Sequence, residues 1–175
     1  MKKYIILLML AHQLTACSVQ SNQYNFIKSL ISENKNYIGP EKNWTASWTD
    51  QKFDVYAINI GNQILYTGSG ANIFFKNKQI YKVTGLFPND SVLGIQFNNP
   101  NLEYFLNNKR ISSDLCQNLK TVSVEVQSEK HSQICFGEKT GETYENQIIT
   151  NSDDLITFLE FKLHPNYPSL KLSIK

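Results

Sequence analysis

The chain has 175 residues, of which 41% are hydrophobic and 18% are charged, and this length suits a single domain. The hydrophobic content is too high, and the charge too low, for a disordered chain. Lysine and arginine number 17 against 15 acidic residues, and a signal peptide containing Lys2 and Lys3 would account for the whole excess. A chain with balanced charge lacks the basic surface of a nucleic-acid-binding protein, so we expect no nucleic-acid partner.

Residues 1–16 have the features of a bacterial lipoprotein signal peptide. A short cationic start, Met1-Lys2-Lys3, precedes an apolar run over residues 4–11 that is too short to span a hydrocarbon core of about 30 Å. Leu14-Thr15-Ala16-Cys17 then resembles a lipobox, in which the cysteine receives diacylglycerol and its amine is acylated, for example with palmitate. The alternative is an ordinary secretory signal in which Cys17 is incidental.

Lipid attachment at Cys17 predicts how the rest of the chain is organised. Residues 17–24 would form the lipidated cysteine and a short tether, and residues 25–175 a single β-rich periplasmic domain. Several acyl chains make membrane anchoring stable. Ser18 follows the cysteine, whereas Asp at that place would resemble an inner-membrane retention signal. We therefore expect a protein on the periplasmic face of the outer membrane, with that membrane as a partner.

Cys116 and Cys135 remain once Cys17 is lipidated, an even pair for an oxidising compartment. A disulfide closing a loop of about 20 residues stabilises a fold by roughly 3 kcal/mol. Two thiols with His131 as a metal set do not match a recognised ligand spacing, and buried free cysteines are the remaining alternative. We predict a structural disulfide and no metal site.

The first element predicted in the mature chain is a helix over residues 23–34, where apolar residues share one helical face. Beyond Gly39-Pro40 the pattern changes to strands. Ten strand-like runs follow, at residues 53–58, 64–67, 72–75, 80–84, 92–97, 121–126, 133–136, 143–149, 155–163 and 170–174. The strict alternation over 121–126 predicts a half-buried strand, and residues 102–106 are expected to form a short helix or turn.

Two of the connections between these strands have the features of hairpins. One is the turn at residues 76–79, where Asn77 can adopt a positive φ, and the other is the loop at 137–141. The spacing of the turns predicts a mainly β fold: an antiparallel curled sheet or partly open β-barrel of about ten strands, with a short N-terminal helix.

The sequence contains few residues in patterns that indicate catalysis. Neither a phosphate-binding loop nor a G-x-S-x-G nucleophile elbow occurs. His131 and His164 have no sequence feature that marks an orienting partner. Glycosidases use pairs of carboxylates as their catalytic acid and base. Two such pairs occur here, Asp153-Asp154 and Glu142 with Glu145, although a turn explains the first pair more simply. We predict a protein that is not an enzyme, with no cofactor.

Four aromatic residues, Trp44, Trp48, Tyr56 and Tyr66, admit two interpretations. Aromatic faces in a periplasmic β-domain can stack on sugars or accept acyl chains, which makes these residues a candidate binding surface. Large aromatic side chains more often fill a core, because each buries about 150–250 Å².

Several segments together resemble the YjbF family of lipoproteins, which includes the GfcB-like lipoprotein of group 4 capsule export. The family pattern is an apolar pair, an Asn-Gly-Arg turn, a second apolar pair and a Lys/Arg-Thr-x-Gly-Leu ending, followed later by a Thr-Gly turn and a closing apolar-Lys-Pro segment. The matching segments are residues 66–68, 73–86, 136–143 and 159–165. Lys78 stands where the family has Gly, and Gln79 where it has Arg.

This resemblance implies a non-enzymatic outer-membrane lipoprotein that acts as an accessory or assembly factor in capsule or exopolysaccharide export. Its expected partners are an outer-membrane β-barrel protein or other polysaccharide export proteins, with the polysaccharide itself as a candidate ligand. The resemblance implies no catalytic residues in this chain. Two alternatives of a different class remain: a periplasmic lipoprotein that binds an acyl chain or glycan in a β-barrel cavity, and an inhibitor of a lytic enzyme.

Overall fold

The computed structural model describes residues 43–125 and 128–175. These residues belong to one compact unit of the chain, Ile38–Lys175. The predicted signal peptide, Cys17 and the predicted helix over residues 23–34 lie outside the described residues. Within the described ranges, the chain has no helix long and apolar enough to cross a membrane.

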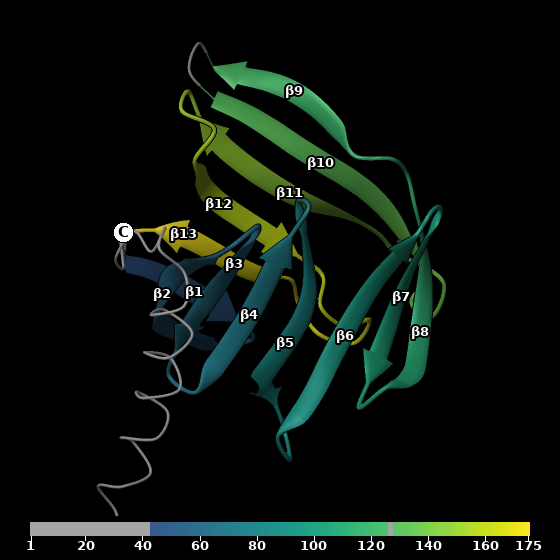
Figure 1. Cartoon of the computed structure of the whole chain (residues 1–175). Helices are drawn as coiled ribbons and strands as arrows, with labels where there is room; N and C mark the ends of the chain where they lie inside the picture. The colour runs from purple at the N-terminus through teal and green to yellow at the C-terminus, as the bar shows by residue number, and fades with distance from the viewer. Residues whose placement is uncertain (1–42, 126–127) are drawn as a thin grey trace, which may run out of the picture. The chain divides into compact units, whose positions relative to one another are not determined.

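The described residues form a sheet of 13 strands, shown in Figure 1. The strands are β1 (Asn43–Trp48), β2 (Gln51–Ile60), β3 (Gln63–Gly68), β4 (Ala71–Lys76), β5 (Gln79–Phe87), β6 (Ser91–Asn98), β7 (Asn101–Leu106), β8 (Lys109–Cys116), β9 (Lys120–Glu125), β10 (Ser128–Gly137), β11 (Thr143–Asn151), β12 (Ile156–Phe161) and β13 (Leu170–Ile174).

The sheet is an antiparallel barrel of 12 strands with one additional strand, β9. Strands β1 to β8 follow one another around the wall, β10 to β13 continue it, and β13 pairs with β1. The barrel closes because β10 pairs with both β8 and β11. Strand β9 lies beyond β8 along the same edge of β10 and, among the described strands, pairs only with β10.

The mainly β antiparallel fold is confirmed, with more strands than the sequence suggested. Both predicted hairpins are present, and Asn77 and Lys78 in the β4–β5 turn have φ values of 51° and 61°. The prediction of a helix or turn at residues 102–106 is wrong, because these residues pair with β6 and β8 as strand β7. Strand β8 was not predicted at all.

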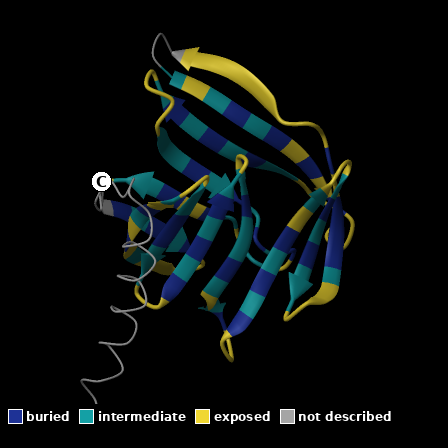
Figure 2. Ribbon diagram, viewed as in Figure 1, coloured by how far each residue is buried: buried dark blue, intermediate teal, exposed yellow. Residues whose placement is uncertain are grey.

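Burial alternates along the strands as expected for a barrel with one face inward. In β4, Ala71, Ile73 and Phe75 are buried and the residues between them are partly exposed. Strand β6 begins with the same alternation over Ser91–Ile95. Figure 2 shows these alternating bands around the wall, and a continuously exposed β9. Strands with one apolar face therefore build the barrel around a shared core.

The barrel interior is filled by side chains that reach across it. Phe75 on β4 and Phe161 on β12, which are not neighbours in the sheet, have ring centroids 6.3 Å apart. Trp48 on β1 contacts Phe87 at the end of β5 (4.9 Å) and Tyr167 in the β12–β13 connection (5.2 Å). Aromatic contacts of this kind add to the stabilisation from apolar burial.

Candidate functional site

The barrel closes at a short seam between β8 and β10. Only Asp114, Leu115 and Cys116 of β8 pair with β10, opposite Gly137, Phe136 and Cys135 respectively. The next pairing along the wall, between β10 and β11, extends from Ser128 to Phe136 on β10. The seam therefore has far fewer ladder hydrogen bonds than the neighbouring pair of strands.

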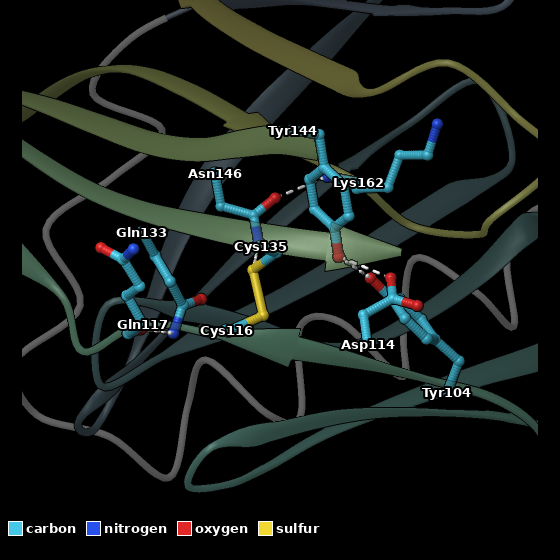
Figure 3. The surroundings of a disulfide bond; sticks show 9 residues. All are labelled: Tyr104, Asp114, Cys116, Gln117, Gln133, Cys135, Tyr144, Asn146 and Lys162. Carbon is cyan, nitrogen blue, oxygen red and sulfur yellow. Dashed lines mark hydrogen bonds between the residues drawn. A yellow bond between two sulfur atoms is a disulfide. The ribbon is translucent and has the colours of Figure 1, made fainter. Parts of the chain in front are cut away.

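A disulfide joins the two strands at this seam. Cys116 and Cys135 are directly opposite each other, with Cα atoms 4.0 Å apart and an S–S bond of 2.08 Å, as Figure 3 shows. Both cysteines are buried. The predicted Cys116–Cys135 disulfide is thus confirmed, and its position adds a covalent link where the ladder is shortest.

Amide hydrogen bonds continue the seam just past the disulfide. The Gln117 backbone N–H donates to the Ile134 carbonyl oxygen at 2.9 Å. The buried Gln133 side chain donates from Nε2 to the Gln117 carbonyl oxygen at 3.1 Å. These bonds hold the segment that leads from β8 to β9 against β10.

A polar cluster lies inside the barrel beside the disulfide (Figure 3). The Tyr144 hydroxyl donates to Asp114 Oδ2 at 2.6 Å, and the hydroxyls of Tyr104 and Tyr144 are 2.8 Å apart. Tyr104 and Asp114 are buried. Strands β7, β8 and β11 each supply one of the three side chains, so the cluster links both sides of the seam.

Burial governs the ionisation of the two phenols. It raises the pKa of Tyr104 and of Tyr144 far above the usual value, because the phenolate is poorly solvated there. The neighbouring Asp114 raises the pKa of both further by charge. Both hydroxyls therefore keep their protons at neutral pH and act as hydrogen-bond donors. This arrangement suits stabilisation of the seam.

Asn146 connects the disulfide to the chain just past β12, and its Nδ2 lies 3.9 Å from Cys135 Sγ. Its Oδ1 accepts a hydrogen bond from the Lys162 backbone N–H at 2.8 Å. The Lys162 ammonium lies 6.0 Å from the centre of the Tyr144 ring, at the limit of a cation–π contact. The chain that leaves β12 is thereby held to β11.

The four aromatic residues of the candidate binding surface do not lie together on the outside. Trp44, Trp48 and Tyr66 are buried in the core, and Trp44 packs edge-on against Tyr66 with centroids 5.0 Å apart. Tyr56 is 48% exposed. The core interpretation therefore describes three of them, and Tyr56 alone of these four is available at the surface.

The two histidines considered in the sequence occupy different parts of the barrel. His131 on β10 is buried, with Nδ1 2.7 Å from the Thr121 hydroxyl and Nε2 3.3 Å from the Lys78 ammonium. His164 packs against Tyr167 at 5.1 Å and near Phe87. The two side chains are thus placed by different contacts.

Glu129, His131 and Asp154 present ligand atoms within 4.8 Å of one another. The Lys78 ammonium also faces the imidazole, and its positive charge disfavours a bound cation there. Burial, followed by the charge of Lys78, lowers the pKa of His131. The imidazole is therefore neutral at neutral pH.

The outer face of the seam carries an exposed apolar surface that the sequence analysis missed. Leu115 and Phe136 are cross-strand neighbours there, and Ile134 lies two residues from Phe136 on the same face. Other exposed apolar residues lie on strand β9 and just before it, and the paired residues Lys120 and Ser132 lie between Ile134 and Val122. We call the set the seam patch; it comprises Leu115, Leu119, Val122, Val124, Ile134 and Phe136.

The alternation over residues 121–126 was the available signal, but its interpretation was wrong. Val122 and Val124 are 57% and 54% exposed, whereas a half-buried strand was predicted. Strand β9 lies beyond the point where β8 leaves β10. Its valines therefore occupy the outer face of a strand outside the closed wall.

The fold and the seam define a disulfide-linked antiparallel β-barrel. The chain is similar in structure to the hypothetical lipoprotein YmcC from Escherichia coli (K12), with a TM-score of 0.53 and 12% sequence identity. The likeness covers 86% of this chain and 94% of that protein, and it shows a shared fold. No known protein family matches the chain, and neither does any curated protein.

Proposed function

We propose that this protein is a lipid-anchored accessory factor of capsule or exopolysaccharide export, acting on the periplasmic face of the outer membrane by contact with export proteins. The observation that carries the proposal is the set of segments resembling the YjbF lipoproteins, preceded by the lipobox ending at Cys17. A barrel fold like that of a protein described as a lipoprotein supports it.

The positions of the resembling residues also support the proposal. Residues 73–86 form the β4–β5 hairpin, and residues 136–143 the β10–β11 turn. Gly85 and Gly141, the glycines of the two matching motifs, have φ values of 76° and 69°, which favour glycine. The resembling residues are thus ones that build the turns of the barrel. The Cys116–Cys135 disulfide, in addition, is typical of a protein in an oxidising compartment.

Deletion and complementation test this role. We expect loss of the gene to reduce surface or secreted polysaccharide, and the wild-type chain to restore it. Cys17→Ala should fail to restore export and should lose labelling by radioactive palmitate, because the anchor is not formed. Polysaccharide output unchanged by the deletion in its native host would overturn the proposal.

A second variant separates contact from catalysis. The combined variant His131→Gln, His164→Gln, Asp153→Asn and Asp154→Asn removes the two histidines and the Asp153-Asp154 pair while keeping hydrogen-bonding side chains. We expect it to restore export once circular dichroism confirms the barrel. A folded variant that restores nothing would contradict a non-enzymatic role.

A further inference from the structure

The barrel wall opens between β5 and β6. The two strands pair at Lys82 with Gly94 and at Val83 with Leu93, and toward the β4–β5 turn their pairing ends there. Among the described strands, β5 beyond this point pairs only with β4, and β6 only with β7. Figure 1 shows β5 and β6 diverging toward the β4–β5 turn. A cleft of about 310 Å³ lies between them.

A β-bulge on β5 accounts for the separation. Phe74 pairs with Lys82 and Phe75 pairs with Ile80, so Tyr81 is an extra residue without a partner on β4. A bulge bends its strand, interrupts regular pairing and redirects a side chain, and bulges are frequent beside functional sites. The pairing of β5 with β6 ends at this bulge, and Tyr81 lines the cleft.

Aromatic side chains lie on both sides of the cleft, Tyr81 on β5 and Phe97 on β6. The Tyr81 ring packs near Phe74 with centroids 6.0 Å apart, and its hydroxyl donates to Gln63 Oε1. These contacts hold the Tyr81 ring in place without a ligand. The electron-rich face of an aromatic ring attracts the slightly positive hydrogens of apolar C–H groups, and one face of a sugar ring presents such groups.

Carboxamide side chains supply the polar part of the lining. Asn77 and Gln79 lie on the β5 side, and Gln96 and Asn98 on the β6 side. Asn98 donates to Glu103 Oε2 at 2.7 Å, whereas the other three side chains make no hydrogen bond to another described residue. A carboxamide has both donors and an acceptor. It therefore matches a sugar hydroxyl, which also donates and accepts.

The charge of the lining is compatible with neutral and acidic sugars. Among the described residues that line the cleft, Lys76 is the only charged one. An acidic sugar unit thus meets a cation there and no carboxylate in the lining.

A peptide strand is the alternative occupant, because the edges of β5 and β6 that face the cleft are unpaired. Bulges are among the features that prevent strand addition at a free edge. On β5 only Gln79 and Ile80 precede the bulge at Tyr81, which is too short for a regular ladder. The lining side chains and the interrupted edge together favour a sugar over a peptide.

We propose that the cleft between β5 and β6 binds a saccharide. Tyr81 and Phe97 pack against the faces of a sugar ring, and Gln79 and Gln96 bond to its hydroxyls. The volume is at the lower end of the range for small-molecule sites, about 300–1,000 Å³. The cleft therefore holds a short part of a glycan and leaves the rest in solvent.

Calorimetric titration of the detergent-solubilised full chain tests the site. The probe is a set of oligosaccharides released by partial acid hydrolysis of the host's surface polysaccharide, a choice that rests on the proposed export role. The oligosaccharides are treated with protease and gel-filtered to remove peptides. We expect saturable binding to the wild-type chain.

Two variants of the lining locate the binding. Gln79→Ala with Gln96→Ala should weaken the affinity at least about tenfold, because hydrogen bonds to hydroxyls are lost on both sides of the cleft. Asn59→Ala with Asn118→Ala is the matched control, because these carboxamides are also exposed but lie outside the cleft; we expect no change from it. Tyr81→Ala should also weaken binding at least about tenfold, whereas Tyr81→Phe, which keeps the ring, should stay within about threefold of the wild type. Circular dichroism checks that each variant is folded.

Three results would overturn the proposal. The first is a wild-type chain that does not bind the protease-treated oligosaccharides at millimolar concentration. The second is binding present only before protease treatment, which identifies a peptide as the occupant. The third is equal affinity in the Gln79→Ala, Gln96→Ala variant and its control.

The same experiments separate this proposal from the export role. Polysaccharide output that falls on gene deletion, with no oligosaccharide binding by the purified chain, rejects the saccharide site and leaves a role through protein contact. Binding that follows the expected pattern, with output unchanged by deletion, rejects the export role and supports the saccharide site.

Discussion

Gly85 is a residue whose identity follows from the backbone around it. It lies in the irregular part of the β5–β6 pairing and has a φ of 76°. A Cβ atom there would overlap the Gly70 carbonyl oxygen and press on Ala71. The β3–β4 turn and β5 can approach this closely only without a side chain at position 85. The same glycine belongs to the segment Lys82-Val83-Thr84-Gly85-Leu86.

We predict that Gly85→Ala lowers the free energy of unfolding by more than about 2 kcal/mol, because the positive φ and the overlap act together. Gly61→Ala is the matched control. Gly61 has a φ of 60° and no atom within 4 Å of a built Cβ, so we expect only the conformational cost of about 1 kcal/mol. Urea unfolding followed by fluorescence of the buried Trp44 and Trp48 measures both. Equal losses in the two variants would show that the close approach does not matter.

At the scale of elements, some strands could be predicted from the sequence and others could not. The β4–β5 hairpin was recognised because its apolar runs flank a turn that contains Asn77. Strand β8 was not recognised because its inward residues include Ser112 and Asp114, which are buried although polar. One carboxylate oxygen of Asp114, Oδ2, accepts a hydrogen bond from Tyr144, which is 30 residues away in the sequence, and no local pattern reveals such a partner.

Some features of the candidate site could also be predicted from the sequence, and others could not. The Cys116–Cys135 pair could be predicted by counting cysteines, but its place at the seam required the register of β8 and β10. The seam patch could not be predicted, because the same alternation of Val122 and Val124 is expected in a half-buried strand. The exposure of these two valines follows from the position of β9 beyond the closed wall, which is set by non-local pairing.

Replacing both seam cysteines tests the role of the disulfide as an element-level link. We predict that Cys116→Ala with Cys135→Ala lowers the free energy of unfolding by about 3 kcal/mol, as expected for the loop they close. Because the β8–β10 ladder is short, amide hydrogen exchange should also accelerate first around residues 114–117 and 133–137. Cys17 is kept in this variant.

The β4–β5 hairpin is the internal control for that experiment, since its own ladder is independent of the disulfide. Its amide exchange should change only as much as the global stability does. The wild-type chain treated with reductant should give the same pattern as the double variant. Exchange that accelerates evenly around the barrel, with no excess at the seam, would contradict a local role.

At the scale of the whole barrel, long-range contacts hold distant parts of the wall together. The β4–β5 turn reaches β10, where Lys78 meets His131, although the two residues are 53 positions apart in the sequence. The β12–β13 connection brings His164 and Tyr167 against Phe87 at the end of β5. Both histidines therefore lie at contacts between parts of the barrel that are far apart in the sequence.

These histidines make stability depend on pH with a definite sign. Burial lowers the pKa of both, and the nearby cations Lys78 for His131, and Lys139 and Lys162 for His164, lower them further. The folded barrel thus keeps them neutral at a pH where the unfolded chain, with a histidine pKa of about 6.5, takes up protons. Protonation favours the unfolded state, so the stability present above about pH 6.5 is lost as the pH falls.

We predict that the free energy of unfolding of the wild-type chain decreases between pH 7 and pH 5, and that His131→Gln makes this decrease smaller. Glutamine cannot be protonated in this range, yet it can still bond to the Thr121 hydroxyl. Lys78→Met should also reduce the decrease, because it removes a cation that disfavours the protonated imidazole, whereas the neighbouring Glu129 and Asp154 carboxylates act in the opposite direction. Urea unfolding at pH 5, 6 and 7, followed by tryptophan fluorescence, measures each slope. A His131→Gln curve parallel to that of the wild type would show that His131 does not couple the contact between the β4–β5 turn and β10 to pH.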